Sequence, residues 1–177
     1  MKTFGIIVCV ILFIIPLLVY GGAIVNAVQM GANCINYLEM AADANSVEIA
    51  NKHLTSAITY LENNNLTSGS TQLLVYRPTN DIGLWYENLK SAQTQLIEAN
   101  NDENLTRLEE SNILMKLRET LLDEESITHP AMISFYPNHI GWFWALILSW
   151  LLWVVGGIGI YIICEDEKPK SYYSYRM

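Results

Sequence analysis

The sequence has little charge, and that charge is unevenly placed. Only 16% of the 177 residues are Asp, Glu, Lys or Arg, against roughly 25% in typical soluble proteins. None of these residue types stands between Lys2 and Glu39 or between Glu125 and Glu165. Hydrophobic residues make up 51% of the chain, too many for a disordered tail, and the net charge of −8 would repel phosphate backbones. We therefore expect a membrane protein with no nucleic-acid partner.

Cysteine and histidine are also scarce, with three of each. The sequence has no HExxH motif, paired CxxC or His-x-His, and no nucleophile elbow or phosphate-binding loop. We therefore expect no metal, no other cofactor and no enzymatic activity.

Two apolar runs have the length of membrane-spanning helices. Residues 4–28 form the first, and at about 1.5 Å per residue this run exceeds a hydrocarbon core of roughly 30 Å. Residues 140–164 form the second, with Trp142 and Trp144 near its start and Tyr161 near its end. Aromatic residues of this kind gather at membrane interfaces. We predict two transmembrane helices.

A cleaved signal peptide is the alternative interpretation of the first run. Lys2 precedes the run, and residues 25–27 resemble a cleavage site. However, the apolar core of a signal peptide is about 7–15 residues long, and this run is longer. We therefore expect an uncleaved signal anchor.

Lys and Arg flank the two runs only on their terminal sides. One basic residue precedes the first run and three follow the second: Lys2, Lys168, Lys170 and Arg176. Because such residues mark cytoplasmic flanks, we expect residues 1–3 and 165–177 to lie in the cytoplasm and residues 29–139 outside it. The expected location is the plasma (inner) membrane.

Small residues occur at helix-packing positions in both runs. They let membrane helices approach closely, so we predict packing, within the chain or between chains, at Ala23, Ala27, Gly31, Gly156, Gly157 and Gly159. Small residues are also common in membrane helices without that role, and this alternative stays open.

The segment 29–139 is acidic and helical by its apolar spacing. Its 15 Asp or Glu and six Lys or Arg give a net charge of −9. The spacing predicts four helices, over residues 30–44, 46–63, 81–100 and 104–123. We expect Asn45, with Glu48, to cap the second helix, and Asn104 or Thr106 to cap the fourth. Four helices return the chain to the face from which it started. We therefore predict an all-α membrane protein in which two transmembrane helices flank an antiparallel four-helix bundle.

Two short segments between breakers have the composition of strands. Residues 71–76 end before Pro78, and residues 131–136 lie between Pro130 and Pro137. Because isolated strands are rarely stable, we expect the two to pair as a small ribbon near the membrane. Irregular loops at the level of the lipid headgroups are the alternative.

Four residues of the acidic segment are candidates for contacts. Arg77, Tyr86 and Arg118 could contact a ligand or partner, although a solvated or salt-bridged Arg77 is the simpler interpretation. Cys34 has no neighbour for an intrachain disulfide, because Cys9 and Cys164 lie at other levels of the predicted topology. It could join two subunits or stay buried and reduced.

Three stretches carry a resemblance to a known group: residues 63–69 (NNNLTSG), 77–89 (RPTNDIGLWYENL) and 112–122 (NILMKLRETLL). Over about residues 35–160 the chain resembles uncharacterised small bacterial membrane proteins, cyanobacterial ones among them. The resemblance implies the same two-span plan and transfers no functional residues. The plan is also similar to the input regions of bacterial chemoreceptors and sensor kinases, but only 13 residues follow the second run, so we expect no output domain.

These observations favour a non-enzymatic role. We expect a cell-envelope protein whose partners are the lipid bilayer and a membrane or envelope protein, with self-association through the spans. The alternative is a small-molecule sensor or accessory subunit that signals through a separate protein.

Overall fold

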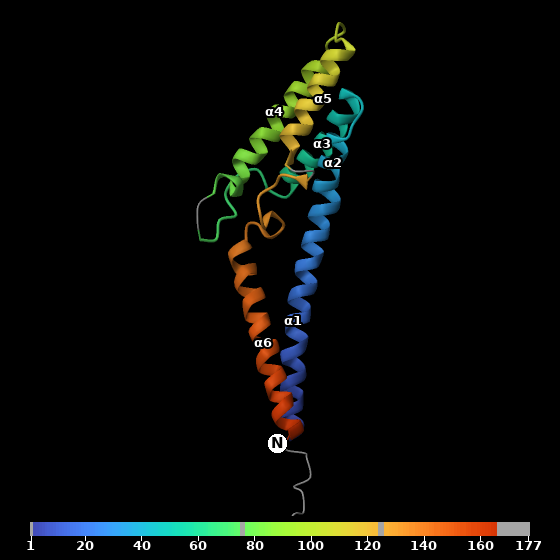
Figure 1. Ribbon diagram of the computed structural model, residues 1–177. Helices are drawn as coiled ribbons and strands as arrows, with labels where there is room; N and C mark the ends of the chain where they lie inside the picture. Colours follow the sequence, from blue (N-terminus) through green and yellow to red (C-terminus); the bar gives the residue numbers. More distant parts are fainter. Residues whose placement is uncertain (1, 75–76, 124–125, 166–177) are drawn as a thin grey trace, which may run out of the picture. The chain divides into compact units, whose positions relative to one another are not determined.

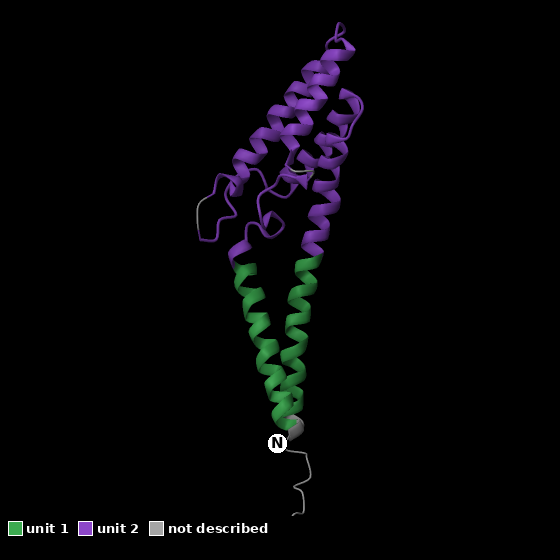
Figure 2. Cartoon of the chain, in the orientation of Figure 1, with its two compact units in different colours: residues 1–24, 141–177 green, residues 25–140 purple. Residues whose placement is uncertain are grey.

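The computed structural model describes residues 2–74, 77–123 and 126–165, apart from the side chains of residues 2–4 and 164–165. Their secondary structure is almost entirely helical (Figure 1). The chain divides into two compact units, residues 1–24 with 141–177 and residues 25–140 (Figure 2). We call the described part of the first the helix pair and the second the helical unit. The cytoplasmic tail predicted over residues 165–177 lies outside the described residues, except for Glu165.

Two helical stretches are long and apolar enough to cross a membrane, Gly5–Ala42 and His139–Ile163. The first consists of α1 (Lys2–Met30), the π-helical segment η1 (Gly31–Ile35) and α2 (Asn36–Ala42). The second belongs to α6 (His139–Glu165). Each contains one of the two predicted spans.

Within the helix pair, α1 and α6 meet through small residues and aromatic rings. A Cβ atom added to Gly156 would lie 3.1 Å from the Phe13 ring, and one added to Gly159 would lie 3.1 Å from Cys9 Sγ. Nothing lies within 4 Å of the same atom at Gly157 or Gly31. Two of the predicted small residues therefore line the contact, while Gly157 and Gly31 do not.

Trp153 of α6 adds to the contact with α1 close to Pro16. Pro16 lies inside α1 and has no N–H to donate, so it disturbs the hydrogen bonds of the preceding turn. The Trp153 indole Nε1–H donates to the carbonyl oxygen of Phe13 in that turn at 3.4 Å. The same indole stacks on the Tyr20 ring, with a centroid separation of 5.3 Å. Trp153 therefore joins α6 to the turn of α1 that precedes Pro16.

The helical unit contains three longer helices, α3 (Val47–Asn63), α4 (Ile82–Asn100) and α5 (Arg107–Leu121). Each begins where a side chain accepts a hydrogen bond from the first turn: Ser46, Asp81 and Thr106. Thr106, one of the two residues predicted to cap this helix, forms a capping box with Glu109. The predicted Asn45 cap is wrong by one residue, because the Ser46 hydroxyl lies three residues before the Ile49 N–H that it accepts.

Four helices share one core in the helical unit. Helix α2 packs on α3 and α5, and α4 packs on the same two helices. Fully buried side chains between them include Leu38, Leu54, Ile58, Leu61 and Leu96. Burying one such side chain stabilises a fold by about 1.5–3 kcal/mol, so this core is the main source of stability in the unit.

The predicted ribbon is wrong in the residues that the structure describes. Residues 71–74 contain no strand, and residues 75–76 lie outside the described part. Segment 131–136 forms turns and the 3₁₀ helix η3 (Ile133–Phe135), because Met132 takes a left-handed conformation with φ 60° that breaks extended structure. A two-residue hairpin forms elsewhere, between β1 (Leu122–Asp123) and β2 (Ser126–Ile127).

The two segments nevertheless meet, through side chains and not as strands. The Tyr136 hydroxyl packs directly on Gly69, which has a φ of +100° and no room for a Cβ atom. The ring of Tyr136 stacks on His139, and His139 Nε2 lies 3.3 Å from the Gln72 carbonyl oxygen. Both segments are thereby fixed to the first residue of α6.

Candidate functional site

One face of α5 forms one side of a charged hollow. Arg107, Glu110, Leu114 and Arg118 recur at intervals of three or four residues, so they share that face of the helix. They line an open hollow of about 690 Å³ together with the chain that joins α2 to α3. We call it the α2–α5 hollow and define it by residues 42–46, Arg107, Glu110, Ser111, Leu114, Met115 and Arg118.

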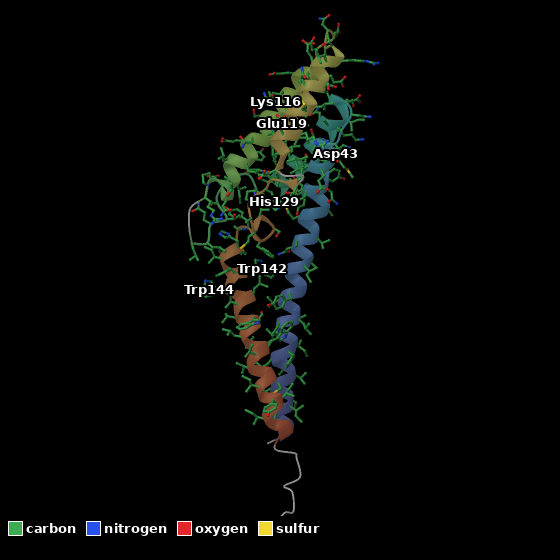
Figure 3. All side chains as sticks on the ribbon, viewed as in Figure 1. Asp43, Lys116, Glu119, His129, Trp142 and Trp144 are labelled. Carbon is green, nitrogen blue, oxygen red and sulfur yellow. The ribbon has the colours of Figure 1, made fainter. Side chains whose placement is uncertain are left out.

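The opposite side of the hollow is the corner between α2 and α3. Asp43, labelled in Figure 3, directly follows α2, and Ser46 caps α3. The Glu110 carboxylate of α5 accepts a hydrogen bond from the Val47 N–H at 3.2 Å. A carboxylate at the positive end of a helix is stabilising, so Glu110 holds the corner against α5.

The charges in the hollow are mixed. Arg118 Nη1 lies 3.5 Å from Asp43 Oδ1, and both side chains are exposed. An exposed ion pair of this kind contributes only about 0–1 kcal/mol to stability. The ion pair can therefore break, and each of its side chains can pair with a charged group of another molecule, with little loss of folding stability.

One exposed apolar side chain, Met115, lines the same hollow, and a second, Leu108, is exposed on the same helix. Met115 is 58% exposed, and Leu108 lies seven residues earlier on α5 and is 72% exposed. Two helical turns separate them, so both project from one face. Methionine and arginine beside each other are enriched at protein interfaces, and this combination makes the hollow suitable for a protein segment.

The other predicted contact residues lie elsewhere. Arg77 is exposed immediately before the 3₁₀ helix η2 (Pro78–Asn80) and does not line the hollow. The Tyr86 hydroxyl donates to Glu62 Oε1 at 2.7 Å. This hydrogen bond, with burial and the Glu62 charge, raises the pKa of Tyr86 to about 12. Tyr86 therefore joins α4 to α3 and stays protonated in ordinary buffers.

A polar chain continues from this pair along the contact between α3 and α4. Lys90 Nζ lies 3.9 Å from Glu62 and donates to Gln93 Oε1 at 2.9 Å. The buried Gln93 then donates to the Thr55 hydroxyl at 2.9 Å. Because each of these polar groups has a hydrogen-bond or ion-pair partner, we interpret them as contacts that hold α3 and α4 together.

Cys34 is a free thiol with no exposed surface. It belongs to the core of the helical unit, between Met30 and Leu38 on the inner face of the first stretch. Its burial is a feature of one of the two alternatives that the sequence left open. A disulfide between subunits would require the side chain to leave the core.

A second, smaller hollow of about 130 Å³ lies between α4 and α5. Lys116, labelled in Figure 3, crosses it and donates to Gln95 Oε1 at 3.0 Å. The residues described contain no group of three His, Cys, Asp or Glu side chains placed to hold a metal ion.

Sequence reasoning identified Arg118 but missed the residues around it. The periodic spacing of Arg107, Glu110 and Arg118 was a readable signal of one charged helix face. Asp43 had no such signal, because it comes from a corner far away in the sequence.

Comparisons with known proteins give no relative: no family model, curated protein or solved structure matches the chain.

Proposed function

We propose that this chain is a non-enzymatic membrane protein of the cell envelope that holds a partner protein through the α2–α5 hollow. The observation that carries the proposal is the coexistence of mixed charge and exposed apolar side chains at one place on a packed helical core. Arg118 and Asp43 supply the charges, and Met115 and Leu108 supply the apolar area.

The two long apolar helices support the membrane part of the proposal. They meet the length and hydropathy that a span requires, and exposed Ile, Leu and Val side chains cover much of both. We propose that they cross the plasma (inner) membrane, that both termini are cytoplasmic, and that the helical unit forms an antiparallel four-helix bundle outside. Self-association through Ala23, Ala27 and Gly31 remains part of this proposal.

Topology is tested with a thiol introduced at Asn100, an exposed residue at the end of α4. The background carries Cys9→Ala and Cys164→Ser and keeps the buried Cys34. We expect a membrane-impermeant thiol reagent to label Asn100→Cys in intact cells and to leave the background unlabelled. Labelling only after the membrane is opened would place the helical unit in the cytoplasm.

Partner binding is tested by a photo-cross-linking amino acid in place of Met115 in intact membranes. We expect an adduct with one defined protein, lost when Arg118→Glu is added. The matched control carries the same amino acid in place of Ile97, which is exposed on α4 outside the hollow. Equal adducts from both positions, or none from Met115, would contradict the proposal.

A small-molecule sensor is the second candidate, and the hollow's size favours it. Ligand pockets commonly measure about 300–1,000 Å³, and this one measures about 690 Å³. A ligand with one carboxylate and one ammonium group would match Arg118 and Asp43. Calorimetric titration of the purified chain with zwitterionic amino acids tests the idea, and heats unchanged by Arg118→Gln would exclude binding there.

A further inference from the structure

The loop before α4 is fixed at two points, once to Tyr136 and once to His139, the first residue of α6. Gly69 lies under the Tyr136 hydroxyl, and the Gln72 carbonyl oxygen lies 3.3 Å from His139 Nε2. His139 is the first residue of an apolar helix long enough to cross a membrane. If that helix is a span, its first residue marks the outer edge of the hydrocarbon layer, and Gln72 lies beside this edge.

Two residues after Gln72, the loop presents an apolar side chain to its surroundings. Leu74 is 91% exposed, the highest value among the large apolar residues described. Leu73, which precedes it, is partly exposed. The cationic Arg77 is exposed and follows residues 75–76, which lie outside the described part. One exposed leucine is common on protein surfaces. What distinguishes Leu74 is its position close to the first residue of α6.

The position of Leu74 is tightly bounded. Two residues of extended chain reach at most about 7 Å, and the headgroup layer on each side of a bilayer is about 5–8 Å thick. The Leu74 backbone therefore lies within about one headgroup thickness of the Gln72 backbone, whose carbonyl oxygen contacts the His139 ring.

We infer that Leu73, Leu74 and Arg77 form a lipid-contact surface on the bilayer that α6 crosses. The leucine side chains enter the headgroup layer, where burial of apolar area is favourable, and the Arg77 guanidinium binds lipid phosphate oxygens through charge-assisted hydrogen bonds. This surface rests on the proposed membrane function. It fixes the helical unit to the membrane at a point besides the two spans.

The test measures the depth of a fluorophore attached to Leu74→Cys. The full chain, with Cys9→Ala, Cys164→Ser and the buried Cys34 retained, is reconstituted into phosphatidylcholine–phosphatidylglycerol vesicles. Quenching is then recorded with lipids that carry a nitroxide near the headgroup and, in separate vesicles, with lipids that carry it near the end of the acyl chain. Because Leu74 is almost fully exposed, its replacement leaves the core intact, and resistance of Cys34 to labelling verifies this.

Two matched positions give the scale. Trp150→Cys labels an exposed residue within α6, and Leu108→Cys labels an exposed residue of α5. Ile82, which begins α4, donates its N–H to the Gly69 carbonyl oxygen. Leu108 follows the other end of this 19-residue helix, which places it about 28 Å from the loop. We expect headgroup quenching at Leu74 to exceed quenching at Leu108 by at least about threefold, because this separation is several times the thickness of a headgroup layer.

The outcomes separate this inference from the proposed function. Strong acyl-chain quenching at Trp150, with equal and weak headgroup quenching at Leu74 and Leu108, would overturn the lipid-contact surface and leave the spans standing. No quenching at Trp150 by either lipid would overturn both. Arg77→Gln is expected to reduce quenching at Leu74, while Arg77→Lys keeps most of it; equal quenching in both variants would overturn the role of Arg77.

Discussion

Leu18 of α1 and Leu54 of α3 belong to the two compact units, and their surroundings are opposite. Leu18 is 71% exposed, whereas Leu54 is completely buried. In water, leaving a leucine exposed forgoes about 1.5–3 kcal/mol relative to burial. The helical unit follows this rule, with leucines inside and charged groups outside. The helix pair places glycine and aromatic contacts inside and aliphatic side chains outside, which suits a medium that is itself apolar.

The contact within the helix pair is most sharply tested by a covalent bond. We expect Gly159→Cys, in a chain with Cys164→Ser, to form a near-complete intramolecular disulfide with Cys9 on mild oxidation, because Cys9 Sγ lies 3.1 Å from an added Cβ atom. Proteolysis between the helices, followed by non-reducing gel electrophoresis, measures it. Gly157→Cys, which faces open space, is the control, and equal cross-linking of both variants would refute the contact.

The next largest effect separates the two leucines. We expect Leu54→Ala to lower the free energy of unfolding of the helical unit by about 2–5 kcal/mol, through lost burial and a residual cavity. Leu18→Ala is expected to change it by less than about 0.5 kcal/mol. Labelling of the buried Cys34 thiol against urea concentration, with Cys9 and Cys164 replaced, reports unfolding. A comparable loss in both variants would remove the distinction between the units.

The helix boundaries illustrate what local sequence determines. Asp81 and Thr106 begin α4 and α5 as expected, because a capping side chain and the N–H groups that it accepts lie within three residues. Asn45 and Ser46 both have side chains suited to capping, and the prediction named Asn45 where Ser46 is the cap. Nearby residues therefore encoded the helices well, with errors of one or two positions.

Long-range features were less readable. Segment 131–136 has strand-like composition, yet Met132 turns and Tyr136 packs on Gly69, a contact 67 residues away along the chain. The α2–α5 hollow likewise depends on Asp43 meeting Arg118. Such pairs are selected by the packing of whole helices, which no residue's own neighbours reveal.

Two glycines outside the contact between α1 and α6 test the role of backbone shape. We expect Gly69→Ala to destabilise the helical unit by about 1–3 kcal/mol, because its φ of +100° and the Tyr136 hydroxyl exclude a side chain. Gly31→Ala, with open space in a helical segment, is expected to stabilise it by about 0.5–1 kcal/mol. Urea unfolding, followed by labelling of Cys34, measures both changes. An unchanged free energy of unfolding in Gly69→Ala would contradict the close packing of Tyr136 on Gly69.

The smallest effect concerns Tyr86. Its pKa is raised from 10.0 to about 12, mainly by the hydrogen bond to Glu62. A raised folded-state pKa contributes stability below the unfolded pKa, and this contribution is lost as pH rises from about 10 to 12. We expect Tyr86→Phe to abolish this loss and to remove one late phenol from the ultraviolet titration of the ten tyrosines. Loss of a phenol that titrates near its ordinary pKa of 10.0, in place of one near 12, would exclude the hydrogen bond.

The π-helical segment η1 has a consequence for insertions and deletions. Met30, Cys34 and Leu38 are spaced by four residues, and all three are buried in one core. In a regular α-helix each four-residue step overshoots one turn by about 40°, so the third side chain would rotate away from the first. The wider turn of η1, in which Asn36 N–H reaches the Gly31 carbonyl, absorbs this drift. Deleting one residue from 31–35 would place Leu38 seven residues after Met30, and seven residues of regular α-helix return to within about 20° of the same face. The helix therefore carries one residue more here than it needs to keep Leu38 in the core, so we expect a one-residue deletion to preserve that face and a further insertion to rotate it away.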